Sequence, residues 1–223
     1  MSQRSTRPRK PEPRWQRRPE ERPEEILDAA VQVFGENGFA RTRLEDIAHR
    51  AGVSKGTLYL YFRSKEDLFR EMVRARIVTV VAEAEERVER SGGTARDQLA
   101  GVIRSVWQSV SREDVARLTQ VVLSELGSFP ELGRFYLEEV IQRGRRLIAR
   151  VLERGIAAGE FRPVDVAIAS RLIPGIVVRL AQNQCAFRHL DPDVPDDAAV
   201  IEGALDLICH GVLHPGHTSS PNS

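Results

Sequence analysis

Residues 46–65 read DIAHRAGVSKGTLYLYFRSK, and this stretch decides the fold because it encodes two short helices around a tight turn. Gly52 supplies the positive φ that ends a helix at little steric cost, and Val53 is apolar enough to fill the corner. Ser54 can then cap the second helix by accepting a backbone hydrogen bond. Such a pair is the helix-turn-helix, which places its second helix in the major groove of DNA.

The first helix of the pair is predicted to begin near residue 43. The segment Thr42-Arg43-Leu44-Glu45 fits the S/T-x-x-E capping box, in which two side chains satisfy backbone amides at a helix start. Leu44, Ile47 and Ala48 recur at helical spacing and give this helix one apolar face. We therefore expect a helix over about 43–51 whose inner face packs on a small domain.

The second helix, over about 55–61, presents hydrogen-bond donors on its outer side. Leu58 and Phe62 lie four residues apart and point inward together, so Lys55, Thr57 and Tyr61 point outward. A further cap, Ser64-Lys65-Glu66-Asp67, then starts a new helix almost at once. The positive N-terminal end of that helix, with Lys65, would suit a phosphate.

The combined pattern I-A-x-x-A-G-V-S-x-G-x-L-Y-x-Y-F-x-x-K-x-x-L resembles the TetR family of bacterial transcriptional regulators, and the resemblance runs from about Ile26 to Leu68. It implies that bases or phosphates are contacted by Lys55, Gly56, Thr57 and Tyr61, the DNA backbone by Tyr59 and Lys65, and that Thr42 and Arg43 anchor the first helix. The family often has a small hydroxyl residue where Arg43 stands, which leaves the cap to Thr42 and Arg43 to DNA. Lys55 is the expected specificity residue, because lysine can donate to guanine O6 and N7.

The charge of the chain is unevenly placed, although the net charge of the 223 residues is only +1. Residues 1–66 hold 14 Lys/Arg and 10 Asp/Glu, whereas the rest of the chain holds 19 and 22. The basic end is the expected nucleic-acid end. No stretch approaches the roughly 18–20 apolar residues of a membrane helix, and the Arg- and Pro-rich start lacks the apolar core of a signal peptide. We expect a cytoplasmic protein without a membrane partner.

Residues 1–22 form a separate segment in which basic side chains lie among prolines and almost nothing is apolar except Trp15. We expect this arm to be disordered in solution. It is either a solubilising tail or an arm that lies along phosphates or enters the minor groove. Residues 215–223 are expected to form a second disordered tail.

The remaining chain is predicted to be all-α. Pro23 opens a helix that Gly38 closes, so helices at about 23–37, 43–51 and 55–61 give a three-helix DNA-binding domain over residues 23–68. A connector helix runs from residue 65 to about 89, where Ser91-Gly92-Gly93-Thr94 breaks the pattern. A larger helical domain over 90–214 follows, with helices at about 97–110, 113–126, 131–158, 163–187 and 195–213.

The resemblance implies that the larger domain forms a homodimer and encloses a small-molecule effector. Members of the family usually dimerise through the last two long helices, which here are 163–187 and 195–213. Their apolar positions are Ala167, Ile168, Leu172, Ile176, Val178 and Leu180 on the first, and Val200, Ile201, Ala204, Leu205, Ile208 and Val212 on the second. This surface is sufficient for a helical dimer interface, or it packs inside one chain.

A candidate effector pocket lies beside Pro174-Gly175, where a proline inside a helix removes a backbone hydrogen bond and kinks the helix. Aromatic side chains with a few polar anchors are typical of such a site. The candidates are Trp107, Phe129, Phe135, Tyr136, Phe187, Arg179, Gln182 and Asn183. Aromatic residues at these positions also suit a plain core. The expected effector is hydrophobic or amphipathic.

Two other interpretations stay open. His210 and His214 lie four residues apart beside Cys209, with His217 close behind, and could hold a metal, although the sequence lacks the glutamate of an HExxH motif. The basic arm alone could bind any duplex, which would make the chain an architectural DNA-binding protein without ligand control. The two cysteines, Cys185 and Cys209, support no disulfide framework.

No catalytic or phosphate-cradling motif is found, so neither an enzyme nor a cofactor is expected. The sequence predicts a regulator, most simply a repressor, whose two 55–61 helices enter successive major grooves of a near-palindromic operator. An effector bound in the larger domain would tilt the connector near 65–89 and change the distance between those helices.

Overall fold

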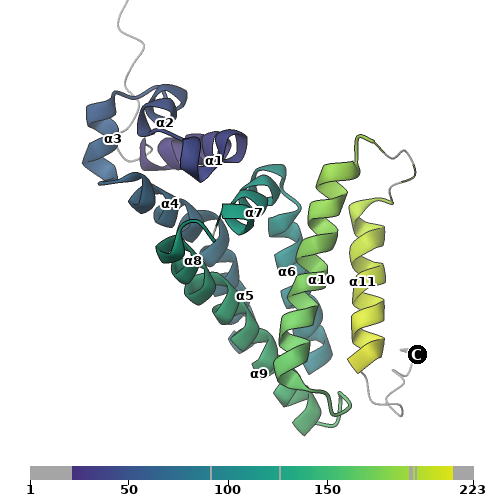
Figure 1. The fold of residues 1–223 in the computed structure, drawn as a ribbon. Helices are drawn as coiled ribbons and strands as arrows, with labels where there is room; N and C mark the ends of the chain where they lie inside the picture. Colours follow the sequence, from purple (N-terminus) through teal and green to yellow (C-terminus); the bar gives the residue numbers. More distant parts are fainter. Residues whose placement is uncertain (1–21, 91, 126, 191–192, 194, 213–223) are drawn as a thin grey trace, which may run out of the picture.

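The structure is a computed structural model that describes residues 22–90, 92–125, 127–190, 193 and 195–212. Every regular element in that part of the chain is a helix, so the predicted all-α fold is confirmed (Figure 1). The arm predicted at 1–22 lies outside the described residues except for Arg22, and the tail predicted at 215–223 lies outside them entirely.

The N-terminal helices α1 (Arg22–Arg41), α2 (Leu44–Arg50) and α3 (Lys55–Tyr61) lie at one end of the molecule (Figure 1). Gly38 interrupts α1 with a φ of 76° and a ψ of 165°, a conformation that favours glycine. Gly52, with a φ of 66°, lies in the turn between α2 and α3. Gly38 breaks α1 where the sequence predicts its end, Gly52 follows the end of α2, and α3 has the predicted bounds.

Two long helical rods lead away from this end. The first consists of α4 (Lys65–Val73), the π-helical segment η2 (Arg74–Val78) and α5 (Thr79–Arg90), and it corresponds to the predicted connector helix. The second consists of α8 (Pro130–Tyr136), the π-helical segment η3 (Leu137–Gln142) and α9 (Arg143–Ala157). The two rods contact each other along their length (Figure 1).

The fold is completed by α6 (Ala95–Val110), α7 (Glu113–Glu125), α10 (Val166–Phe187) and α11 (Asp197–Val212), whose bounds differ from the predicted ones by at most three residues. Pro174 lies inside α10, which continues as one helix through it. Among the residues described, no helix is long and apolar enough to cross a membrane.

Two apolar cores divide the chain differently from the predicted domains. The first core joins α1–α4 and η2 to α7 and α8, for example through Phe34, Phe69 and Leu118. The second joins α5, α6, α9, α10 and α11, for example through Leu99 and Val151. The helices α7 and α8 therefore pack with the N-terminal helices in one shared core.

Candidate DNA-binding surface

The cap of α2 lies one residue later than predicted. The Arg43 backbone N–H donates to Asp46 Oδ2 at 3.2 Å, so Arg43 and Asp46 replace the predicted pair Thr42 and Glu45. A carboxylate at the third helical position can accept from the N-cap amide whether or not the N-cap residue carries a hydroxyl. The prediction of a capping box at Thr42 was therefore wrong by one residue.

Contacts at both ends fix α3. Ser54 Oγ accepts from the Thr57 N–H at 3.0 Å, as the sequence predicts, and lies 2.8 Å from Thr57 Oγ1. At the other end the Phe62 N–H donates to the Leu58 carbonyl at 3.0 Å. The Leu58 side chain has no exposed surface and anchors the helix on the first core. The helix therefore presents one fixed face to solvent.

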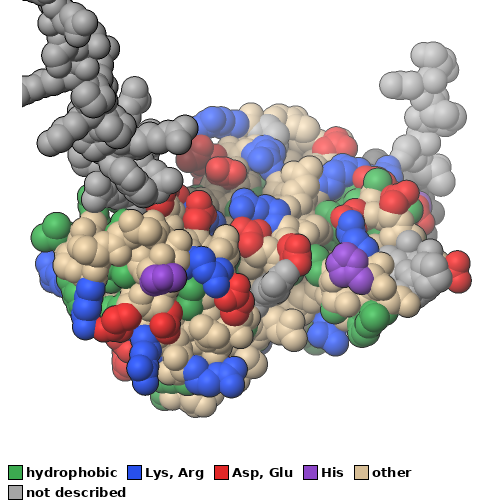
Figure 2. Space-filling model, turned by 90° about the horizontal axis from the view of Figure 1, so that it is seen from above, with side chains coloured by type: hydrophobic (Ala, Val, Ile, Leu, Met, Phe, Trp, Pro, Cys, Tyr) green, Lys and Arg blue, Asp and Glu red, His purple; other side chains and the backbone are tan. Residues whose placement is uncertain are grey.

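Most of the predicted DNA contacts lie on the solvent side of the motif. The exposed ones are Arg43, Lys55, Gly56, Tyr59 and Tyr61. Thr57 is half-buried, with its hydroxyl against Ser54. Leu60, which is 83% exposed, lies on the same helix and was missed by the sequence prediction. Figure 2 shows hydrophobic side chains next to Lys and Arg side chains at the end of the molecule where α3 lies.

Two other predicted contacts serve the fold. Thr42 is 2% exposed, and its hydroxyl donates to the Gly38 carbonyl at 2.7 Å. Lys65 Nζ donates to the carbonyl oxygens of Phe39, Ala40 and Thr42 at 2.8, 3.2 and 3.1 Å. An ammonium has three donors, so these bonds use all of them. In the structure both side chains hold the chain between Gly38 and the start of α2.

The electrostatics of the motif centre on an ion pair between Lys55 of α3 and Glu45 of α2. The hydrogen bond to the Glu45 carboxylate raises the pKa of Lys55, and the same bond lowers the pKa of Glu45. The Lys55 ammonium also lies 5.8 Å from the centre of the Tyr59 ring. Exposed ion pairs of this kind are weak, so DNA can compete with Glu45 for Lys55.

A carboxylate from α7 holds the segment that leads into α2. The Ala40 backbone N–H donates to Glu125 Oε2 at 2.9 Å. Gly38 faces the same carboxylate, and a Cβ at this position would collide with Glu125 Oε1. A shift of α7 relative to α1 must therefore break this contact or move the start of the helix-turn-helix.

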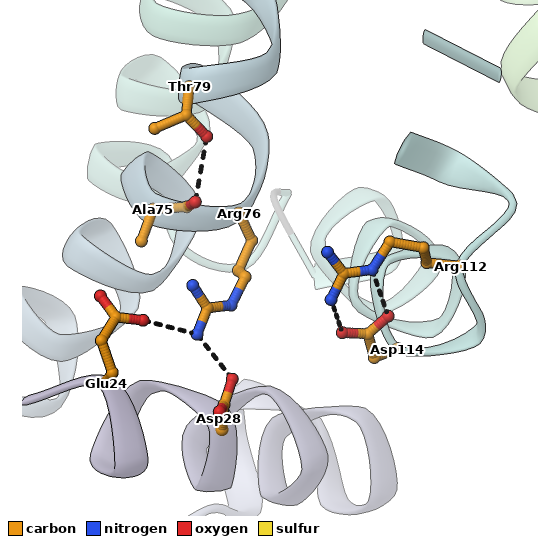
Figure 3. Close-up of polar contacts among 7 residues, drawn as sticks. All are labelled: Glu24, Asp28, Ala75, Arg76, Thr79, Arg112 and Asp114. Atoms are coloured by element: carbon orange, nitrogen blue, oxygen red, sulfur yellow. Dashed lines mark hydrogen bonds and ion pairs between the residues drawn. The ribbon is translucent and has the colours of Figure 1, made fainter. Parts of the chain in front are cut away.

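Arg76 of η2 ties the connector to the first turns of α1 (Figure 3). Its Nη2 lies 2.9 Å from Glu24 Oε2 and 2.6 Å from Asp28 Oδ1, and only 14% of its side chain is exposed. Figure 3 also shows the neighbouring pair of Arg112 and Asp114, whose atoms Nη2 and Oδ2 are 2.9 Å apart at the start of α7. The connector and α1 are thus joined by charge as well as by the first core.

Two family models match the chain. The model of bacterial regulatory proteins of the tetR family matches residues 26–72, and the model of the C-terminal domain of AefR-like transcriptional repressors matches residues 97–210. The second match alone covers more than half of the chain. The chain belongs to the TetR family.

Relatives of known role agree with this TetR-family membership. The fatty acid metabolism regulator protein of Bacillus subtilis is 32% identical over 190 residues, which are 84% of this chain and 94% of that protein. The transcriptional repressor KstR2 of Rhodococcus jostii is 32% identical over 151 residues, 67% of this chain and 72% of that protein. A crystal structure of the regulator FadR from Bacillus subtilis with stearoyl-CoA matches with a TM-score of 0.71 at 28% identity, covering 84% of this chain and 98% of that chain. The chain is a TetR-family transcriptional regulator.

The effector residues predicted for this TetR-family chain do not form one site. Trp107 belongs to the second core, whereas Phe129, Phe135 and Tyr136 belong to or pack against the first. Phe129 packs edge-on against Phe39 of α1, with ring centres 4.7 Å apart. These four aromatic residues are therefore divided between two cores, because helical spacing does not specify which core an aromatic side chain joins. Arg179 and Phe187 are both exposed on α10.

Gln182 of α10 stands out among the remaining candidates. Its Nε2 is buried and has no hydrogen-bond partner among the described residues, and the same is true of Ser111 Oγ in the turn between α6 and α7. Cys185, one helical turn after Gln182, donates from Sγ to the Ser111 carbonyl at 3.5 Å, so this face of α10 lies toward that turn. Buried polar atoms without a partner are uncommon and indicate a place for water or a ligand. Asn183 is half-buried beside Gln182.

The α10 and α11 helices leave apolar side chains exposed. Besides Phe187, the large ones are Ile168 (54% exposed), Leu172 (58%) and Ile176 (46%) on α10, and Leu207 (76%) on α11. These four, without Phe187, line one open groove of about 570 Å³ between the two helices. Ile201, Ala204, Leu205 and Ile208, which were predicted for a dimer interface, are buried within the single chain. Leu207 was not predicted.

The structure describes only part of the cluster that the alternative metal-site interpretation requires. His210 Nδ1 lies 2.9 Å from Asp206 Oδ1, and burial raises the pKa of the Cys209 thiol. His214 and His217 lie outside the described residues. Within the described residues, no group of three or more His, Cys, Asp or Glu side chains is arranged to hold a metal ion.

Proposed function

We propose that this chain is a repressor that binds a near-palindromic operator as a homodimer and leaves it when an acyl-CoA thioester binds. The observation that carries the DNA part is the fixed, exposed face of α3, with Lys55, Gly56, Tyr59 and Tyr61 on a helix anchored by Leu58. Two such helices one turn of DNA apart would enter successive major grooves on one side of the duplex.

The proposed DNA contacts are Arg43, Lys55, Gly56, Thr57, Tyr59 and Tyr61, all exposed or half-buried in the structure. Lys55 is the proposed base contact, since its ammonium exchanges Glu45 for guanine O6 and N7. We expect Lys55→Ala to weaken binding to the operator far more than binding to random DNA. An equal loss on both duplexes would assign Lys55 to phosphate contact.

The proposed dimer interface is the apolar groove between α10 and α11, which includes Leu172 and Leu207. Two copies related by a two-fold axis would bury the same face of each chain and form a four-helix arrangement. This interface would set the spacing of the two α3 helices, because α10 packs on α6 and α9 and these in turn contact the connector helix α5.

The proposed effector class rests on the relatives and on the second core. One relative is named as a fatty acid metabolism regulator, and a similar structure contains stearoyl-CoA. In this chain a cavity of about 100 Å³ lies between α5 and α6, beside Val88 and Val102. Ligand sites commonly measure about 300–1,000 Å³, so a long acyl chain must widen this space. We place the acyl chain along α6, with Gln182 and Ser111 offering polar partners near its end.

The proposed switch follows from which helix borders that space. The α5 helix is the C-terminal part of the connector. An acyl chain between α5 and α6 therefore pushes the connector away from α6. Arg76 and the first core then carry the displacement to α1 and the helix-turn-helix. The effector acts only through the difference in its affinity for two states of the dimer, which differ in the distance between the two α3 helices.

Thermal unfolding with added ligands tests the effector class. A ligand that binds the folded protein raises the melting temperature, by an amount set by its concentration relative to its Kd. We expect stearoyl-CoA to raise it, free CoA to have little effect, and stearoyl-CoA to release the operator at the same concentrations. Stabilisation by free CoA equal to that by stearoyl-CoA would contradict a site for the acyl chain.

A further inference from the structure

The solvent face of α3 contains an apolar side chain that the proposed polar contacts do not explain. Leu60 is 83% exposed, more than any other large hydrophobic side chain in the described residues. A single exposed leucine elsewhere on a surface needs no explanation. This one lies between Tyr59 and Tyr61 on the helix proposed to enter the major groove, where most side chains offer hydrogen bonds.

The position of Leu60 on the helix makes it a protruding point of α3. Gly56 and Leu60 are one turn apart, on the side of the helix opposite the fully buried Leu58. A Cβ added at Gly56 would meet only Ser54 Oγ, at 3.8 Å, so the space beside this turn is open. Helical side chains lean toward the N-terminus, so the Leu60 side chain lies over the bare backbone at Gly56.

The chemistry of the major groove offers one apolar partner for such a side chain. Base pairs present donors and acceptors there, and thymine alone adds a C5-methyl group. We propose that Leu60 packs against the methyl group of one thymine in each half-site, while Lys55 donates to a neighbouring base. This inference rests on the proposed operator binding and adds a thymine requirement that the polar contacts do not impose.

The expected loss of binding free energy is modest for one methyl group and twice as large when both half-sites are changed. Removing one methyl from an apolar contact changes a binding constant by about fourfold. A symmetric operator contains the contact twice, so removing both methyl groups should weaken binding by roughly 15-fold. Leu60→Ala should remove this sensitivity, and alanine at an exposed helical position retains the helix.

The test replaces each thymine of the selected operator by deoxyuridine, symmetrically in both half-sites, and measures the Kd for the full-length chain and for Leu60→Ala. Deoxyuridine lacks only the methyl group and keeps every hydrogen bond. We expect one symmetric pair of replacements to weaken binding by the parent chain and to leave binding by Leu60→Ala unchanged. Leu123→Ala, a change of the same kind at a 47% exposed leucine on α7, should behave as the parent chain.

Either of two results overturns the inference while operator binding stands. The parent chain tolerates deoxyuridine at every thymine, or Leu60→Ala keeps the same sensitivity as the parent chain. If Leu60→Ala no longer sediments as a dimer, the Leu60 side chain belongs instead to a contact between the two chains. If the parent chain selects no sequence at all, the proposed function fails together with the inference.

Discussion

Two glutamines on α10 differ in hydrogen bonding, although the side-chain amides of both are turned into the protein. Gln182 Nε2 is buried without a partner among the described residues, whereas Gln184 Nε2 donates to the Pro195 carbonyl at 2.8 Å. A buried polar atom without a partner costs about 1–3 kcal/mol. We therefore expect Gln182→Leu to stabilise the ligand-free protein, and Gln184→Leu to destabilise it by a similar amount.

The same pair of variants separates an effector contact from plain packing. We expect Gln182→Leu to reduce release of the operator by stearoyl-CoA, because the proposed polar partner is gone. Urea unfolding gives the stability change, and a titration of the protein–operator complex gives the response. A destabilised Gln182→Leu protein with an unchanged response would show that the amide has a structural partner and no effector role.

Glu45 places a negative charge on the surface that we propose faces DNA. Because its carboxylate pairs with Lys55, Glu45→Gln should release the ammonium and reduce repulsion from phosphates. We expect tighter operator binding at low salt, with the gain shrinking as salt rises, because the Debye length falls to about 8 Å at physiological ionic strength. Glu153→Gln, at an exposed position on α9, removes the same charge elsewhere and is the control. Weaker binding by Glu45→Gln would mean that the carboxylate positions Lys55.

For single residues, the sequence predicts which side chains are exposed better than it predicts what each side chain does. The exposed positions of α3 follow from helical spacing around Leu58. Thr42 and Lys65 match a DNA-contact pattern in sequence, but the Thr42 hydroxyl donates to the Gly38 carbonyl and Lys65 Nζ donates to carbonyls that follow Gly38. No local pattern indicates the Lys65 bonds, because they join residues 23 to 26 positions apart. Leu60 escaped notice because an apolar residue in a helix is ordinarily assigned to the core.

At the scale of elements, the junction of α1, α2 and α7 depends on Gly38. Its φ of 76° disfavours other residues, and a Cβ there would displace the Glu125 carboxylate that accepts from Ala40. We expect Gly38→Ala to destabilise the protein by about 1–3 kcal/mol. For a chain of this size each kcal/mol lowers the melting temperature by about 2–4 °C.

Gly144→Ala is the matched control for that change. Gly144 lies in α9, and an added Cβ would meet nothing within 4 Å. Alanine in a helix interior is favoured over glycine by about 0.5–1 kcal/mol, so this variant should melt at a slightly higher temperature. If both variants melt alike, the Glu125 contact does not hold the junction.

The sequence predicts where helices form, but it does not predict which of the two cores each helix joins. Caps such as Ser54 and Ser64, and breaks such as Gly52, are local signals that fix α3 and α4. By contrast, η2 and η3 each replace a stretch of regular helix by wider turns, which change the direction of later side chains. The attachment of α7 and α8 to the first core is a long-range choice between two apolar surfaces, which periodicity alone cannot make.

At the scale of the whole molecule, operator binding by two α3 helices requires the proposed dimer formed by α10 and α11. Leu172→Glu or Leu207→Glu would place a carboxylate in the apolar groove, so either variant should sediment as a monomer and lose most operator affinity. Both side chains are more than half exposed in the single chain, so folding should be retained. Leu123→Glu on α7 introduces the same charge outside the groove and should remain dimeric. A dimeric Leu172→Glu protein would place the interface elsewhere.

We propose that a symmetric pair of α3 helices reads DNA sequence. The most direct test is the selection of bound duplexes from a random pool by the full-length protein at near-physiological salt, with Lys55→Ala in parallel. We expect the parent chain to recover an inverted repeat whose half-sites lie about one helical turn apart, and Lys55→Ala to lose bases within each half-site. Salt-sensitive binding with no consensus, equal for both proteins, would contradict the account and assign binding to non-specific charge.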